Sequence, residues 1–123
     1  MAQILIVDDS VTARKLIKKS IEICITQDVE FIEAGNGQQA MEVLHNKAVD
    51  IVFTDLNMPE MDGTSLLKRI KASPKLNHLP VVVITSLKNQ AAEKLLLQDH
   101  ALAVLEKPLK IPEVYKVLQA VLN

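Results

Sequence analysis

Of the 123 residues, 49% are hydrophobic and 24% are charged, and the formal net charge is −1. This length suits one domain with one core, and the composition excludes a disordered tail protein. No long basic run marks a surface for DNA or RNA, so direct binding of nucleic acid is not expected. Cys24 is the only cysteine, which excludes an internal disulfide and fits a reducing compartment.

The N-terminal residues argue against export and against membrane insertion. The apolar run from Ile4 to Val7 is too short for a signal sequence and ends in the carboxylates of Asp8 and Asp9. No stretch of the chain approaches the length that a helix needs to span a bilayer. We therefore expect a cytoplasmic protein that makes no membrane contact.

Short apolar runs along the chain predict five strands. The runs at 4–7, 51–53 and 81–84 are rich in β-branched residues and unbroken, which is typical of parallel strands covered on both faces. Weaker candidates are 30–34 and 103–105. Strands and helical segments alternate strictly, which predicts an α/β sandwich with right-handed crossovers. We expect a single domain over residues 1–123.

Between the strands, apolar residues recur with the period of a helix. In the first of these segments they form one face, and Arg14 with several other charged residues forms the opposite face. The apolar residues of the five expected helices, in chain order, are Leu16, Ile17, Ile21 and Cys24; Ala40, Val43 and Leu44; Leu66, Leu67 and Ile70; Leu95 and Leu96; and Val114, Val117, Leu118 and Val121.

Polar residues follow the expected strands, at the edge where parallel sheets bind their ligands. Asp8 and Asp9 follow the first strand, Asp55 the third, Thr85 the fourth and Lys107 the fifth. In a sheet of strand order 2-1-3-4-5, the first, third, fourth and fifth strands stand side by side, and three acids, a hydroxyl and an ammonium would then converge on one edge. Three carboxylates in one cleft repel each other, and a hard divalent cation offsets that repulsion.

The all-oxygen character of this set favours Mg²⁺ or Mn²⁺ rather than zinc, because no histidine or cysteine belongs to the motif. With the metal bound, Asp55 would act as a carboxylate nucleophile toward a phosphoryl donor. The metal and Lys107 would offset charge on the transferring group, and Thr85 would donate a hydrogen bond to a phosphoryl oxygen. These residue types together predict phosphoryl transfer.

Four motifs at matching intervals resemble the response regulator receiver family, especially its stand-alone chemotaxis type. They are Asp8-Asp9, the stretch from Asp55 to Gly63, Thr85-Ser86 and Lys107-Pro108. The resemblance runs from the first strand to the last helix. It implies a flavodoxin-like (βα)5 fold, which is a doubly wound parallel sheet with strand order 2-1-3-4-5.

The resemblance also implies where the phosphoryl group and the metal would bind. Asp55 would be phosphorylated by a sensor histidine kinase or a phosphotransfer protein. Asp8 and Asp9 would hold Mg²⁺ together with Asp55, and the backbone carbonyl of Asn57 would complete the protein ligands.

The remaining motif residues would serve the phosphoryl group and its loop. Lys107 would pair with the group, Thr85 would move toward it as a switch, and the Lys107–Pro108 bond would be cis. Pro59 and Gly63 would shape the loop into the third helix, where glycine permits a backbone conformation that other residues resist.

Each site residue also has a purely structural interpretation. Asp8 and Asp9 would cap the first helix, and Asp55 would be a turn residue. Thr85 would be a strand-end residue and Lys107 a solvated charge. The spacing that these residues share with one another favours the site over the separate structural roles.

Two positions depart from the family pattern, on the face of the fourth helix, fifth strand and fifth helix where receivers contact partners. Val104 stands where many receivers carry an aromatic switch residue, and His100 stands where glycine is common. In one interpretation, output depends on Thr85 and a shifted loop over 86–89, with Tyr115 on the partner surface. In the other, the domain acts as a phosphoryl sink or shuttle.

Asn57 and Leu87 occupy positions that, in the family, border the route of the water that removes the phosphoryl group. Leu87 offers no polar group to orient that water, so a moderately to long-lived phosphoryl group is expected.

Three other functions fit the sequence less well. A phosphorylation-independent interaction domain would lack part of the acid and lysine set, which is complete here. An aspartyl phosphatase generally needs a second acid two residues after its nucleophile, where Asn57 stands. A flavin phosphate would be repelled by an acidic cleft, and aromatic residues make up only 2% of the chain. The leading interpretation is a monomeric single-domain response regulator that signals by protein contact and is not an enzyme in the usual sense.

Overall fold

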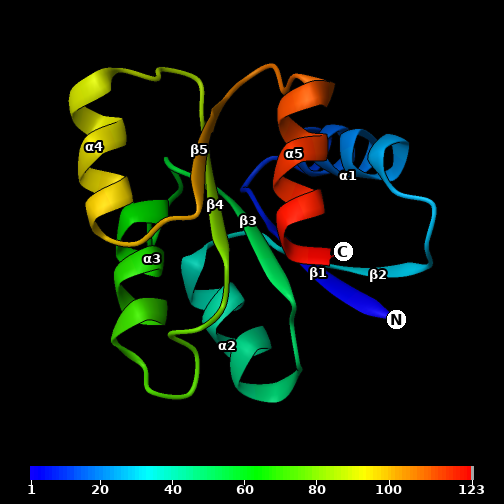
Figure 1. The fold of residues 1–123 in the computed structure, drawn as a ribbon. Coiled ribbons are helices and arrows are strands. Elements are labelled where there is room, and N and C mark those ends of the chain that lie inside the picture. Colours follow the sequence, from blue (N-terminus) through cyan, green and yellow to red (C-terminus); the bar gives the residue numbers. More distant parts are fainter. Residues whose placement is uncertain (123) are drawn as a thin grey trace.

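Strands and helices alternate along the whole chain in this computed structural model, which describes residues 1–122 (Figure 1). The strands are β1 (Ala2–Val7), β2 (Val29–Ala34), β3 (Ile51–Asp55), β4 (Val81–Thr85) and β5 (Ala103–Glu106). The helices are α1 (Val11–Cys24), α2 (Gly37–Asn46), α3 (Gly63–Ala72), α4 (Gln90–Gln98) and α5 (Ile111–Leu122). Every predicted strand and helix is present, and the strands run one or two residues past their predicted bounds.

The strands form one parallel sheet in the order β2-β1-β3-β4-β5. All residues of β3 and β4 are buried, and so are the last four of β1. These strands are covered on both faces, which explains the unbroken apolar runs at 4–7, 51–53 and 81–84. The predicted fold class, a flavodoxin-like (βα)5 sheet, is confirmed.

Helices cover the two faces of the sheet in different numbers (Figure 1). α1 and α5 pack on one face through Ile17, Ile21, Val114 and Leu118, together with alternate strand residues such as Ile4 and Phe53. The second core, on the other face, contains buried residues of α2, α3 and α4. Successive strand side chains point to opposite faces, so each central strand serves both cores. Among residues 1–122, none of the helices is both long and apolar enough to cross a membrane.

Two leucines expected on the buried faces of helices are in fact exposed. Leu16 is 62% exposed and Leu95 is 63% exposed. In each helix the next residue, Ile17 or Leu96, is the one that faces the core. One helical step rotates a side chain by about 100°, so two adjacent residues cannot both point at the sheet when the buried stripe is narrow.

Four helices begin at a residue whose side chain accepts a hydrogen bond from the backbone amide three residues ahead. These residues are Ser10 for α1, Asn36 for α2, Asp62 for α3 and Asn89 for α4. Such caps satisfy amide groups that have no partner within the helix. Ser10 therefore caps α1, and the alternative in which Asp8 or Asp9 has this role is wrong. The turn between β1 and α1 is short, so Asp8 and Asp9 stay at the edge of the sheet.

His100 lies at the end of α4 in the left-handed backbone region, with φ of 73°. Its amide donates to the Leu97 carbonyl at 3.0 Å, and the Ala101 amide donates to the Leu96 carbonyl at 3.0 Å. This pair of bonds is the Schellman ending of a helix, in which the left-handed position favours glycine. The departure from glycine at His100 therefore falls where a side chain carries a conformational cost.

Candidate functional site

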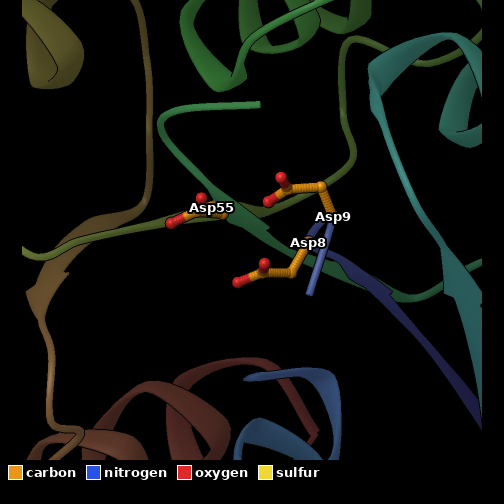
Figure 2. Close-up of side chains that lie close together, drawn as sticks. All are labelled: Asp8, Asp9 and Asp55. Carbon is orange, nitrogen blue, oxygen red and sulfur yellow. The ribbon is translucent and has the colours of Figure 1, made fainter. Parts of the chain in front are cut away.

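The carboxyl ends of β1, β3, β4 and β5 bring the predicted residues together at one edge of the sheet. Figure 2 shows Asp8 and Asp9 beside the end of β1 and Asp55 at the end of β3. One carboxylate oxygen from each of the three acids lies within 4.8 Å of the others. Asp8 and Asp55 are buried, and Asp9 is exposed. Two adjacent acids and a third far along the chain thus form one cluster.

Lys107 enters this cluster from the end of β5. Its Nζ atom lies 3.0 Å from Asp8 Oδ2 and 3.0 Å from Asp55 Oδ1. Its backbone amide donates to the Thr85 carbonyl at 2.8 Å, and the Lys107–Pro108 peptide is cis as expected. Lys107 is therefore paired with two site carboxylates, and its interpretation as a solvated charge is wrong.

The environment of the cluster shifts two pKa values upward. Burial raises the pKa of Asp55, and the negative charges of Asp8 and Asp9 act in the same direction, against the lowering effect of Lys107. For Lys107, burial lowers the pKa, but its hydrogen bonds to Asp8 and Asp55 outweigh that effect and the net shift is upward. The single ammonium is thus firmly charged, yet it does not fully offset the acids around it.

Asp8 is held by several groups besides Lys107. Its Oδ1 accepts from the Ser10 amide at 2.9 Å, and its own amide donates to the Ala34 carbonyl at 3.1 Å. Arg14 donates from Nη1 to the Asp8 carbonyl oxygen at 2.7 Å and from Nε to Glu33 at 2.8 Å. Helical periodicity placed Arg14 on a solvated face, but its side chain is only 17% exposed.

The loop between β3 and α3 is fixed by a close approach at Gly63. The Gly63 amide donates to the Leu56 carbonyl at 2.8 Å, and a Cβ atom at Gly63 would collide with the backbone of Asp55 and Leu56. No glycine in the described chain has a positive φ, so the expectation of a glycine-specific conformation at Gly63 is wrong. Glu60 has the left-handed backbone of this loop, with φ of 70°. Asn57 lies exposed in the same loop, and the ligand role of its carbonyl stays a prediction.

Thr85 ends β4 as a buried residue, 3% exposed. Its hydroxyl oxygen accepts a hydrogen bond from the Leu87 amide at 3.2 Å, which ties the start of the β4–α4 loop to the strand. Leu87 itself is exposed, and Val104 is buried at 4% exposure one strand away. Thr85 is therefore bonded to the start of the β4–α4 loop, and its role as a switch stays a prediction.

The donor set suits a hard divalent cation. Three carboxylates offer only oxygen ligands, and the one ammonium between them leaves an excess of negative charge. Mg²⁺ and Mn²⁺ prefer oxygen ligands and tolerate an open site that keeps several waters. An exposed Asp9 beside buried Asp8 and Asp55 gives such a site one face toward solvent.

Comparisons with known proteins identify the family of this chain. A sequence profile of the response regulator receiver domain matches residues 4–119. The chain is 38% identical over 85 residues to a chemotaxis protein CheY homolog of Campylobacter jejuni, covering 68% of this chain and 64% of that relative. It is 40% identical over 87 residues to the chemotaxis protein CheY of Pseudomonas aeruginosa, covering 68% and 66%. The Mn²⁺-bound form of response regulator Rcp1 has a TM-score of 0.79 and 28% identity, over 98% of this chain and 91% of that chain.

The chain belongs to the response regulator receiver domain family, because the profile covers nearly all of it. It is a CheY-like receiver domain, as the four motifs suggested. The matched part of the chain spans 64% of the length of the Campylobacter relative. Receiver domains bind Mg²⁺ through acidic residues, and the cluster of Asp8, Asp9 and Asp55 provides such residues here.

Proposed function

We propose that residues 1–123 form one receiver domain of a two-component phosphorelay that accepts a phosphoryl group on Asp55. The observation that carries this proposal is the pairing of Lys107 Nζ with Asp8 and Asp55, at 3.0 Å each. This edge of the sheet offers a carboxylate nucleophile, a second buried carboxylate and a cation within reach of the same group. A sensor histidine kinase or a phosphotransfer protein would donate the phosphoryl group.

The transfer needs only Asp55 as a covalent participant. A carboxylate oxygen of Asp55 attacks phosphorus and forms the new P–O bond, while the bond from phosphorus to the donor histidine nitrogen breaks. That nitrogen keeps the electron pair, and Asp55 becomes an acyl phosphate. Lys107, already at hydrogen-bond distance from Asp55, stabilises negative charge on the phosphoryl oxygens.

Water later hydrolyses the acyl phosphate, releasing inorganic phosphate and restoring the carboxylate. The phosphorylated state is the signal, so this chain is a phosphoacceptor with slow autodephosphorylation rather than an enzyme acting on a separate substrate.

The metal in this proposal is Mg²⁺, and Mn²⁺ has the same ligand preferences. Asp8, Asp9 and Asp55 would hold it together with the Asn57 carbonyl. When bound, the ion supplies positive charge that offsets the phosphoryl oxygens during transfer. Asp8 is kept in place for this role by the Ser10 amide, and Asp9 stays accessible to solvent.

Output would begin at Thr85. Movement of its hydroxyl toward the phosphoryl group breaks the hydrogen bond from the Leu87 amide and releases the loop over 86–89. The face formed by α4, β5 and α5 lies next to this loop and exposes Leu102 and Tyr115 to a protein partner. Because Val104 is buried and small, it would stay passive in this movement.

Measuring partner binding of Thr85→Ala and Val104→Tyr, with and without phosphorylation, distinguishes this output from a role as phosphoryl sink or shuttle. A direct switch requires partner binding to lose its dependence on phosphorylation in Thr85→Ala, and predicts stronger coupling in Val104→Tyr. A sink predicts a phosphorylated form with no distinct partner.

The names of the CheY relatives support a chemotaxis-like pathway as the setting of this signal. We place the protein in the cytoplasm, as a monomer that contacts proteins and does not contact nucleic acid or membrane. The near-neutral charge and single cysteine support this placement.

The first experiment is incubation with Mg²⁺ and a small-molecule phosphodonor, followed by intact-mass spectrometry. The proposal predicts a phosphoryl adduct that disappears with EDTA and in Asp55→Asn. Asp62→Asn is the matched control, because Asp62 caps α3 and lies outside the acid cluster. A folded, metal-binding protein that forms no adduct would contradict the proposal and leave an interaction module.

A further inference from the structure

Arg14 connects three elements at the acidic edge. From α1, its Nη1 donates to the backbone carbonyl of Asp8 at the end of β1, and its Nε donates to Glu33 near the end of β2. The two bonds are 2.7 Å and 2.8 Å long. The side chain of Arg14 is 17% exposed and that of Glu33 is 44% exposed. The bond to the backbone is therefore the better shielded of the two.

The carbonyl of Asp8 belongs to the same rigid peptide plane as the amide of Asp9. A group that fixes this oxygen also fixes the direction in which the chain leaves β1 and carries the Asp9 side chain. Among the residues that the structure describes, the Asp9 carboxylate has no hydrogen bond or ion pair of its own. Two side-chain contacts therefore restrain the backbone on either side of Asp9: Asp8 Oδ1 accepts from the Ser10 amide, and Arg14 donates to the Asp8 carbonyl.

A simple stabilising role for Arg14 explains less of this arrangement. An exposed ion pair such as that with Glu33 contributes little to stability. In addition, Arg14 is the fourth residue of α1, near the helix N-terminus, where a cation is opposed by the helix dipole. Arg14 donates to a carboxylate and to a backbone carbonyl from two different nitrogens of one rigid plane, a fixed geometry that the ammonium of lysine does not reproduce.

We infer that Arg14 is a positioning residue for the metal site, which holds the Asp8–Asp9 peptide so that both carboxylates face Asp55. This inference rests on the proposed function, because it assumes that these acids bind a divalent cation.

Charge and geometry predict opposite effects when Arg14 is removed. A guanidinium close to the acids repels a dication, so loss of charge alone would tighten metal binding. Loss of a group that orients metal ligands weakens metal binding, typically by about 10- to 100-fold. The sign of the change in metal affinity therefore distinguishes an effect of the Arg14 charge from an effect of Arg14 on the position of the metal ligands.

The experiment is isothermal titration of the metal-free full chain with Mn²⁺, for wild type, Arg14→Met, Arg14→Lys and Lys18→Met. Lys18 is one turn further along α1 and contacts the Phe31 ring, 5.3 Å from its centroid, so it serves as the matched charge control. We expect binding about tenfold weaker in Arg14→Met, a similar loss in Arg14→Lys, and no weakening in Lys18→Met.

A second measurement does not depend on metal. In ¹H–¹⁵N spectra of the metal-free protein, the Asp9 amide should shift more than the Asp55 amide in Arg14→Met. Unchanged or tighter Mn²⁺ binding in Arg14→Met, or wild-type binding in Arg14→Lys, overturns the inference. Urea unfolding shows whether Arg14→Met folds. If it does not, the test is the chemical-shift change of the Asp9 amide in Arg14→Lys, and an unchanged shift there overturns the inference. If wild type binds no Mn²⁺ or forms no adduct on Asp55, the proposed function fails instead.

Discussion

Replacing Lys107 by methionine removes the one cation at 3.0 Å from both Asp8 and Asp55 while keeping an apolar stem of similar length. Asp8 is 1% exposed and Asp55 8% exposed, so neither carboxylate regains much hydration in exchange. The variant leaves two buried negative charges beside each other and beside Asp9. We therefore expect the metal-free protein to become less stable.

The size of the loss follows from charge separation and screening. Two unit charges about 4 Å apart attract each other by about 4 kcal/mol at an effective dielectric constant of 20. Removing one partner from a fully buried pair costs about 3 to 5 kcal/mol. The Lys107 side chain is 30% exposed, so water screens part of this interaction and we expect a loss of about 2 kcal/mol.

Metal and pH should each reduce that loss. Mg²⁺ binds only the folded site and adds about 2.7 kcal/mol at a hundredfold excess over its Kd, and without Lys107 it no longer competes with an ammonium. Acid protonates Asp55, whose pKa is already raised by burial and rises further without Lys107. The loss should therefore be largest in EDTA at neutral pH and should shrink with Mg²⁺ or below the pKa of Asp55.

Urea unfolding of wild type and Lys107→Met, in EDTA and in saturating Mg²⁺, tests this reasoning. Lys110→Met is the control, since Lys110 is an exposed lysine near the start of α5. An equal loss with and without Mg²⁺ would falsify the idea that Lys107 and the metal offset the same carboxylates.

Four further predictions concern single residues. Asp55→Asn should stabilise the metal-free protein by about 1 kcal/mol, because burial makes the charged carboxylate unfavourable in the folded state. The same burial raises the pKa of Asp55, so urea unfolding should show this gain disappearing as the pH falls below that pKa. His100→Gly should raise the free energy of unfolding by about 1 kcal/mol by relieving the positive φ, whereas His100→Ala should give no such gain. Gly63→Ala should lower it by about 2 kcal/mol and reduce adduct formation in the mass assay, since the new Cβ would meet the Asp55 carbonyl. Leu87→Glu should change the decay rate of the phosphoryl adduct by supplying a group that orients water, and identical decay in both proteins would refute that role.

Much of the fold was predictable because the central strands are buried on both faces. β4 has five buried residues, and the first four, from Val81 to Ile84, are all apolar, so this run is visible in the sequence. The helix faces were less predictable at their margins. Leu16 and Leu95 are apolar yet exposed, and hydrophobicity alone does not tell which of two adjacent residues faces the sheet. The strand order came from the resemblance to receivers, since periodicity does not determine order.

The acids of the site were predictable because of where they stand in the chain. Asp8, Asp9 and Asp55 each end or follow a strand, and parallel strands bring such positions to one edge. The roles of Gly63 and His100 could not be predicted from their positions in the chain, because they depend on contacts made only in the folded structure. The collision that requires glycine at Gly63 involves the Asp55 backbone, and the left-handed ending at His100 depends on how α4 terminates.

Arg14 shows what a sequence pattern leaves out most clearly. Its place in the helical period is that of a solvated charge, and that assignment is wrong because the ends of β1 and β2 lie beside α1 in the folded chain. One signal was available, since a cation near a helix N-terminus opposes the helix dipole and so needs a compensating partner. Lys107 and Arg14 contact different groups of Asp8, the side-chain carboxylate and the backbone carbonyl. Lys107 offsets the charge of its carboxylate, and Arg14 fixes its carbonyl, so loss of the first should favour a cation in the site and loss of the second should disfavour it.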